Sequence, residues 1–177
     1  DWNGDRVLDL VVTNFEDPGR AALLVGDGRG GFAAPRFLST GKYPRFPRAG
    51  DWNGDGTLDL VLAANSGYNI YSLYVFLGDG SGGFGAARLL PFGSNPSELL
   101  TSDVDRDGRS DLVFFTDTGL AGGVKLNLLR GDGAGGFLVS TGPSPFGNSG
   151  IMLLDVNRDG RIDLVGSRDE TVQVSLG

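Results

Sequence analysis

Short apolar runs alternate with glycine-rich or aspartate-rich turns along the whole chain. The runs at 58–64, 110–115 and 162–166 each follow an aspartate-rich turn, and those at 70–77 and 124–129 come next after a polar connection. Runs of this length between turn residues are typical of β-strands, and glycine or aspartate interrupts every window long enough for a helix. The first three runs are apolar at successive positions, so we expect strands whose two faces are both covered by neighbouring sheets.

Two turn motifs recur in register, which indicates a repeat. The aspartate-rich motif begins at residues 1, 51, 103 and 155, so successive copies are 50, 52 and 52 residues apart. The glycine-rich motif reads VGDGRGGF at 25–32, LGDGSGGF at 77–84 and RGDGAGGF at 130–137. A short strand is expected before the later aspartate-rich motifs, at 47–50, 99–102 and 150–154, and another after the second glycine-rich motif, at 84–91. Four strands in about 50 residues is the size of a propeller blade.

We therefore predict an all-β fold, a β-propeller of four-stranded antiparallel blades with a repeat of about 50–52 residues. The chain is expected to hold about three and a half blades: an incomplete blade at 1–45, blades at 46–97 and 98–148, and an incomplete blade at 149–177. Phe32, Phe84 and Phe137 end the glycine-rich motifs and are expected to fill the space between blades. Because the chain starts without methionine, on the first aspartate of a motif, we expect it to be a segment of a longer protein.

The aspartate-rich motifs, called loops one to four in chain order, place side-chain oxygens on alternate residues. Such oxygens can converge on one hard cation when a glycine at the sixth position allows a sharp reversal and the seventh residue offers its backbone carbonyl. A metal ligand is therefore predicted at positions 1, 3, 5, 7 and 9 of every loop. The predicted ligands are Asp1, Asn3, Asp5, Val7 and Asp9 in loop one; Asp51, Asn53, Asp55, Thr57 and Asp59 in loop two; Asp103, Asp105, Asp107, Arg109 and Asp111 in loop three; and Asp155, Asn157, Asp159, Arg161 and Asp163 in loop four.

The predicted cation is Ca²⁺, up to four ions with one in each loop. Magnesium fits a flexible all-protein cage less well, because it demands strict octahedral geometry and releases its water reluctantly. The loops begin like an EF-hand, but position 12 holds Val12, Leu62, Phe114 or Gly166 in place of the bidentate glutamate, which favours a β-hairpin loop. The alternative is a set of metal-free aspartate turns, and four copies in register argue against it.

The four loops are not expected to bind equally. Loop one carries Arg6 where the other loops carry a glycine, so its sixth position adopts a costlier backbone conformation. Loop three alone has four side-chain carboxylates. We therefore predict that loop three binds Ca²⁺ most tightly and that the loop beginning at Asp1 binds it most weakly.

Composition narrows the classes of function. The 177 residues include no cysteine and no histidine, which excludes disulfides, thiolate chemistry and Ser-His-Asp or Cys-His catalysis. Four Ca²⁺ add eight positive charges and turn the net charge of −7 into about +1, so the acidity is mainly an internal supply of ligands. We expect no nucleic-acid partner, and no apolar run is long enough to span a membrane. Extracellular calcium modules bind at about 10⁻⁴ to 10⁻³ M, which favours an extracellular, periplasmic or cell-surface location.

The four acidic loops and three GDGxGGF turns resemble the FG-GAP/VCBS repeats, which form the blades of the integrin α-subunit β-propeller and of many secreted bacterial proteins. The resemblance covers essentially the whole chain. It implies a β-propeller with calcium bound between the first and second strand of each blade, and a metal that is structural rather than catalytic. Members of the family serve as adhesion modules, as ligand-binding domains and as appendages to enzymes, so the fold alone does not decide the function.

In an antiparallel blade the acidic loops and glycine-rich turns share one end, and the other connections share the opposite end. At the end opposite the acidic loops we expect a basic and aromatic cluster that could bind a protein or glycan ligand. Its residues are Lys42, Tyr43, Arg45, Phe46 and Arg48. The alternative is a solvated loop with its aromatic rings tucked between blades. The residues 130–132 spell RGD, but Gly131 and Asp132 belong to the glycine-rich motif, so we interpret the tripeptide as a coincidence.

The sequence therefore predicts a non-enzymatic, calcium-stabilised binding or adhesion module of a secreted or surface protein. Two alternatives stay open. In the first, the chain is a subunit of an extracellular array or filament that self-assembles through its incomplete blades. In the second, it is a non-catalytic appendage or a domain of a polysaccharide-active enzyme.

Overall fold

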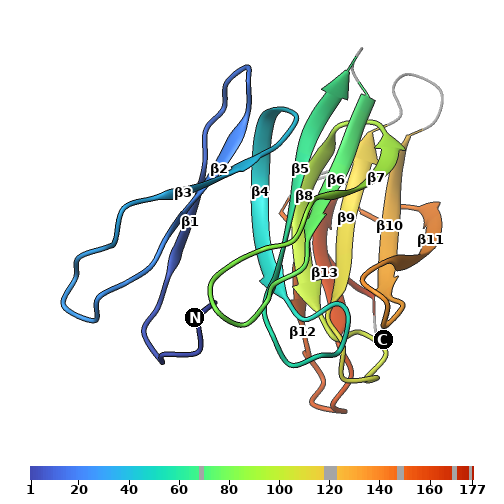
Figure 1. Ribbon diagram of the computed structural model, residues 1–177. Coiled ribbons are helices and arrows are strands. Elements are labelled where there is room, and N and C mark those ends of the chain that lie inside the picture. The colour runs from blue at the N-terminus through green and yellow to red at the C-terminus, as the bar shows by residue number, and fades with distance from the viewer. Residues whose placement is uncertain (68–69, 118–122, 147–149, 169–170, 176) are drawn as a thin grey trace.

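The computed structural model describes residues 1–67, 70–117, 123–146, 150–168, 171–175 and 177, and every regular element in this part of the chain is a β-strand (Figure 1). The strands form four antiparallel sheets in which neighbours follow chain order. The first sheet comprises β1 (Leu10–Thr13), β2 (Arg20–Leu24) and β3 (Arg36–Ser39), and the second comprises β4 (Lys42–Gly50), β5 (Asp59–Gly67), β6 (Ile70–Phe76) and β7 (Arg88–Gly93). The third comprises β8 (Pro96–Ser102), β9 (Asp111–Asp117), β10 (Val124–Gly131) and β11 (Phe137–Pro143), and the fourth comprises β12 (Met152–Leu154), β13 (Asp163–Arg168) and β14 (Thr171–Ser175).

In the second and third sheets the strand that follows the acidic loop, β5 or β9, is buried along most of its length, as its continuous apolar pattern predicts. After loop one, in contrast, β1 lies at the edge of its sheet, and Leu10 and Val12 are exposed. In β5, Val61 and Ala63 pack into one buried cluster with side chains of the third sheet, whereas Leu60 and Leu62 pack into a second cluster with the first sheet. A third cluster, around Phe115, joins the third and fourth sheets. Alternate residues of one strand thus serve two different cores, and this requires apolar residues at every position.

The four sheets lie next to one another in chain order. Across sheets, β1 contacts β4, β4 contacts β8, and β8 contacts β12, so neighbouring sheets approach through their leading strands. Figure 1 shows the acidic loops at the lower end of the sheets and the C-terminal end of β5 at the upper end. Among the described residues there is no helix of the length and apolarity needed to cross a membrane.

Strand β4 differs from its prediction. The sequence suggested a short strand at 47–50 after a connecting loop, but the strand begins at Lys42 and includes the whole basic and aromatic segment. Two β-bulges interrupt its pairing with β5, and the non-glycine residues Tyr43 and Phe46 both have a φ of 54°. The irregular backbone hid the strand from a pattern-based prediction. The predicted boundary at residue 148 lies outside the described residues.

Aromatic side chains connect acidic loops one and two to the glycine-rich turn of the next sheet. The rings of Trp2 and Phe84 lie 6.0 Å apart and those of Trp52 and Phe137 lie 6.3 Å apart, both pairs edge to face. The expectation that Phe84 and Phe137 fill the space between sheets is confirmed. It is wrong for Phe32, which is 48% exposed.

A double-mutant cycle tests this contact. Trp52→Leu and Phe137→Leu should each lower the free energy of unfolding, and the two losses should couple by about 0.5–1.5 kcal/mol, the usual contribution of an edge-to-face pair. Urea titration measures each variant. Phe146, which packs in the cluster around Phe115, supplies the control: coupling between Trp52→Leu and Phe146→Leu should be close to zero. Equal coupling in both cycles would contradict a direct contact.

Candidate metal centre

The first aspartate of each acidic loop folds the loop around its own carboxylate. In loop two, Oδ1 of Asp51 accepts hydrogen bonds from the amides of Gly54 and Asp55 at 2.7 and 3.2 Å, and Oδ2 accepts one from the amide of Gly56 at 2.8 Å. The bonds from the fifth and sixth amides recur in the other three loops. Amide donors that point at one carboxylate stabilise its charged form.

Two left-handed residues make this wrapping possible. The predicted left-handed residue at the sixth position is present in all loops, and Arg6 adopts a φ of 69° there without the help of a glycine. The fourth position is left-handed as well, at Gly54, Arg106 and the equivalent residues of the other loops. The sequence carried a signal for this in Gly4 and Gly54, but the arginines in loops three and four obscured it.

The third, fifth and seventh positions continue the chain of hydrogen bonds. In loop two the Asn53 amide group donates to Oδ2 of Asp55 at 2.7 Å, and the Thr57 amide donates to Oδ1 of Asp55 at 2.8 Å. The hydrogen bonds from Thr57 and Asn53 lower the pKa of the Asp55 carboxyl. The predicted ligands at these positions therefore lie in one compact loop with their oxygens held by N–H donors.

The aspartate at the ninth position ties the acidic loop to the glycine-rich turn of its own sheet. Asp59 is fully buried, and its two oxygens accept the amides of Trp52 at 3.1 Å and Gly78 at 2.9 Å. Asp9, Asp111 and Asp163 make the same pair of bonds in their loops. Burial raises the pKa of Asp59, the two amide bonds lower it, and the carboxylates of Asp55 and Asp51 raise it further. The partner glycines were missed in the sequence because they lie in a separate motif.

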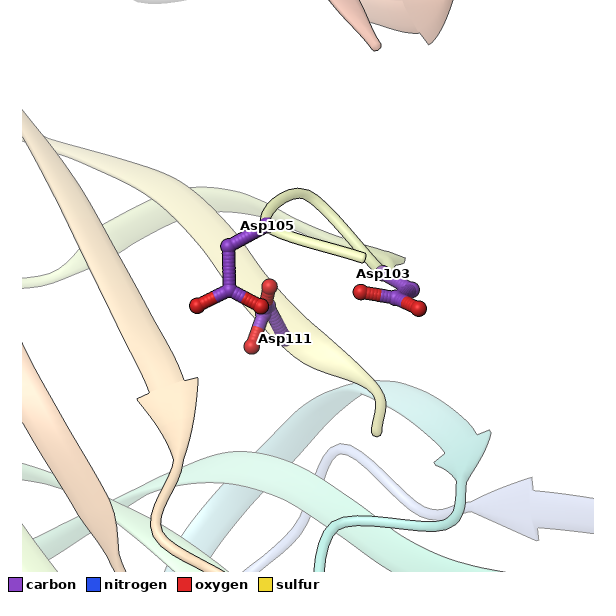
Figure 2. Close-up of side chains that lie close together, drawn as sticks. All are labelled: Asp103, Asp105 and Asp111. Atoms are coloured by element: carbon purple, nitrogen blue, oxygen red, sulfur yellow. The ribbon is translucent and has the colours of Figure 1, made fainter. Parts of the chain in front are cut away.

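Three carboxylates converge in loop three. Asp103, Asp105 and Asp111 each offer an oxygen, and these atoms all lie within 4.8 Å of one another. Figure 2 shows Asp103 and Asp105 on the loop and Asp111 at the start of β9. Converging hard oxygen ligands fit a hard cation, which would offset their mutual repulsion. The fourth carboxylate of the loop, Asp107, is instead paired with Arg109.

The predicted ligand-binding cluster is brought together only in part. Lys42 forms an ion pair with Asp17 at 2.6 Å, and Arg48 lies 3.9 Å from Glu98. The Arg45 guanidinium, in contrast, lies over aromatic rings and pairs with no carboxylate among the described residues. Its carbon is 5.3–5.7 Å from the ring centres of Phe15, Phe46 and Tyr71.

Phe15 and Tyr71 complete the set of rings around Arg45. The sequence analysis missed them because Phe15 lies in the connection between β1 and β2, and Tyr71 lies in β6. Tyr43 packs against Phe15 with ring centres 5.2 Å apart. The Tyr71 hydroxyl accepts a hydrogen bond from Nη2 of Arg45 at 3.2 Å. We call Arg45, Phe15, Tyr43, Phe46 and Tyr71 the arginine cage.

The left-handed sixth position gives a clean stability test. Gly56 has a φ of 83°, and a methyl group added there would meet nothing within 4 Å, so Gly56→Ala changes only the backbone preference. We expect it to lower the free energy of unfolding by about 1–2 kcal/mol in the presence of a chelator. Gly142→Ala is the control, because Gly142 also has open space around it and is not left-handed. This control should be neutral or slightly stabilising, and equal losses in the two variants would contradict the explanation.

The acidic loops and the glycine-rich turns are the features that relate this chain to known proteins. The profile of the FG-GAP-like repeat family matches three overlapping segments, residues 1–62, 51–114 and 103–166, and each begins at an acidic loop. A search of curated proteins found no significant match. FG-GAP repeats are typical of extracellular proteins, often bind Ca²⁺ and are generally non-catalytic. Since the matched segments cover most of the sequence, the chain belongs to the FG-GAP-like repeat family.

Proposed function

We propose that this chain is a calcium-stabilised segment of a β-propeller that serves as a binding or adhesion module of a secreted or surface protein. The observation that carries the proposal is the convergence of three carboxylates in loop three, in a loop that recurs four times. Repeated carboxylates at close range are unfavourable unless a cation or N–H donors offset them. Ca²⁺ is the cation that oxygen-rich flexible loops of this kind hold best.

The propeller arrangement is supported by the way the sheets stack. Neighbouring sheets contact through their leading strands and share apolar clusters across their faces, as blades around an axis do. The sheets have three or four strands each. The position-nine aspartates fix the two turns at one end of each sheet, and this leaves the opposite end for recognition.

In each loop the ion would be held by the side-chain oxygens at positions 1, 3, 5 and 9 and by the backbone carbonyl at position 7. The position-3 oxygen belongs to an asparagine in loops one, two and four and to Asp105 in loop three. The bound cation supplies positive charge that cancels repulsion among the carboxylates. Backbone amides already orient the carboxylates at positions 1 and 5, as in loop two. Among the described residues, the carboxylates converge closely enough to share an ion in loop three. Because a divalent ion favours ionised carboxylates, it acts against the burial that raises the pKa of Asp59 and Asp111.

Calcium should therefore stabilise the folded chain. At about 10 mM Ca²⁺, each site with a dissociation constant of about 10⁻⁴ to 10⁻³ M adds about 1.4–2.7 kcal/mol to the free energy of unfolding. Thermal unfolding with Ca²⁺, with Mg²⁺ and with chelator measures the effect, and Mg²⁺ should give a much smaller gain. Asp103→Asn combined with Asp105→Asn should remove the contribution of loop three alone. Identical unfolding curves with calcium and with chelator would refute the proposal.

The partner is expected at the end of the sheets opposite the acidic loops, where the arginine cage lies. Lys42 pairs with Asn65 in the strand ladder, whereas Gly50 pairs with Asp59 beside loop two, so the cage occupies the half of β4 away from the metal end. Lys42 and Arg48 pair with Asp17 and Glu98, whereas Arg45 has no carboxylate partner in the part of the chain that the structure describes. An uncompensated guanidinium beside exposed rings suits a carboxylate-bearing protein or glycan ligand.

Arg45→Gln tests this face. Hyaluronate oligosaccharides provide the probe, and the same oligosaccharides with their carboxylates methyl-esterified provide the neutral comparison. We expect calorimetry to show binding of the acid form only, and Arg45→Gln to weaken it at least tenfold, the scale of a charge-assisted hydrogen bond. Lys125→Gln removes an exposed charge on β10 and should leave binding unchanged. Undiminished affinity in Arg45→Gln would exclude the cage as the site.

Self-assembly into an extracellular array is the second candidate. One observation favours it: the first sheet exposes Val12 and Phe37, and the fourth exposes Met152 and Val172. Exposed apolar side chains on the outer sheets are surfaces that further sheets could cover. The binding module remains the better supported proposal, because the arginine cage gives it a specific site.

A further inference from the structure

Loop three differs from the other loops at its third position. Loops one, two and four carry an asparagine there, and its amide group donates to Oδ2 of the fifth-position aspartate at 2.8, 2.7 and 2.9 Å respectively. Loop three carries Asp105, which has no N–H group to donate when it is ionised. The hydrogen bond between positions three and five is therefore replaced by two carboxylates that repel each other.

Two arginines take over the role of the missing amide. Nη1 of Arg130 lies 3.6 Å from Oδ2 of Asp105, and Nη2 of Arg109 pairs with Oδ2 of Asp107. Arg109 is itself positioned by a hydrogen bond from its Nε to the Gly131 carbonyl at 3.0 Å. Oδ2 of the additional carboxylate, Asp105, and Oδ2 of Asp107 thus each face a guanidinium from the same repeat unit.

Comparison of the repeats shows that the two changes occur together. The first residue of the glycine-rich motif is Val25 in the first unit and Leu77 in the second, and it is Arg130 in the third. The third unit is also the one whose acidic loop has the extra aspartate, Asp105. An added negative charge and an added positive charge therefore appear in one unit and lie against each other in the fold.

The same contacts explain the RGD sequence at 130–132. Arg130 faces Asp105, the Gly131 amide donates to Oδ1 of Asp111 at 3.1 Å, and Oδ1 of Asp132 accepts the amide of Ala134 at 2.7 Å. All three residues are engaged in the acidic loop or in their own turn. The arginine of this tripeptide therefore has an internal partner, consistent with a role inside loop three.

We propose that Arg130 is a built-in counter-ion of loop three that competes with the metal ion for Asp105. This inference rests on the proposed calcium function. With no metal bound, the arginine keeps the carboxylates of the loop together. When Ca²⁺ binds, it must displace or share that positive charge, so loop three fills at a higher calcium concentration than four carboxylates alone would give. Charge count alone predicts loop three as the tightest site, and Arg130 reduces that advantage.

Calcium titration followed by NMR can resolve loop three from the others. Gly56, Gly108 and Gly160 occupy the sixth position of loops two, three and four, and the amide of each donates to the first aspartate of its own loop. The shift of each amide with added Ca²⁺ gives a dissociation constant for its own loop. Arg130→Gln should lower the constant reported by Gly108 about two- to fivefold, the scale of a half-exposed ion pair, and leave the other two unchanged.

A double-mutant cycle shows whether Arg130 acts through Asp105. In an Asp105→Asn background, which restores the asparagine of the other loops, Arg130→Gln should no longer change the constant at Gly108. Arg130→Lys retains the charge and should bind like the unmodified protein. Lys125→Gln is the matched control, since it removes the same charge from the far end of β10.

The outcomes separate the two proposals. If Gly108 reports an unchanged or weaker affinity in Arg130→Gln while calcium binds, the counter-ion role is wrong and the calcium function stands. An effect of equal size in the Asp105→Asn background would also refute it, because the arginine would then act elsewhere. If no sixth-position amide responds to calcium in any variant, the proposed calcium function fails and the counter-ion role fails with it.

Discussion

The fold depends on a buried carboxylate that holds two turns at once. In loops two to four the position-nine aspartate starts an inner strand of its sheet and is fully buried. One of its oxygens accepts an amide of the acidic loop, and the other accepts the amide of Gly78, Gly131 or Gly177. A buried charge is tolerated only when its oxygens are satisfied, so Asp59 can remain buried only if Trp52 and Gly78 stay in place. These hydrogen bonds hold the acidic loop against the neighbouring turn of its sheet, and they place the Trp52 ring against Phe137 of the third sheet.

The repulsion between neighbouring carboxylates is offset in the acidic loops by several kinds of positive or N–H partner. Carboxylates close together need a positive partner, and in this chain the partner is a backbone amide, an asparagine amide or an arginine. A divalent cation is the strongest partner of this kind, and it adds to the amides rather than replacing them. The amides hold the loops in shape without a metal ion, so under the proposed function calcium would change the stability of the chain more than its fold. In loop three the Arg130 guanidinium, in place of an asparagine amide, lies against the carboxylates of the loop.

The sequence predicted the sheets and loops well because both follow from local, repeated patterns. The repeated aspartates predicted which residues of each acidic loop take part in its hydrogen bonds. The continuous apolar runs predicted strands buried on both faces, as observed for β5. What it did not predict depends on contacts between distant segments. The glycine amide that binds Asp59 belongs to another motif. The cage around Arg45 takes Phe15 from the connection between β1 and β2, and Tyr71 from β6. Strand β4 was missed in part because bulges disrupt the alternation on which pattern reading relies.

The two ends of the sheets differ in backbone strain and in how their charged side chains are paired. At the end that carries the acidic loops, glycine occupies most of the left-handed positions, and every carboxylate at position nine has two hydrogen-bond donors. At the other end, Tyr43 and Phe46 hold a φ of 54° without glycine on either side of Arg45, a guanidinium that has rings but no counter-ion among the described residues. Strained residues and an uncompensated charge persist only where the surrounding structure enforces them. The hydrogen-bonded end that carries the acidic loops can hold Tyr43, Arg45 and Phe46 in place, because β4 and β5 run from loop two to the cage and pair with each other between these two points.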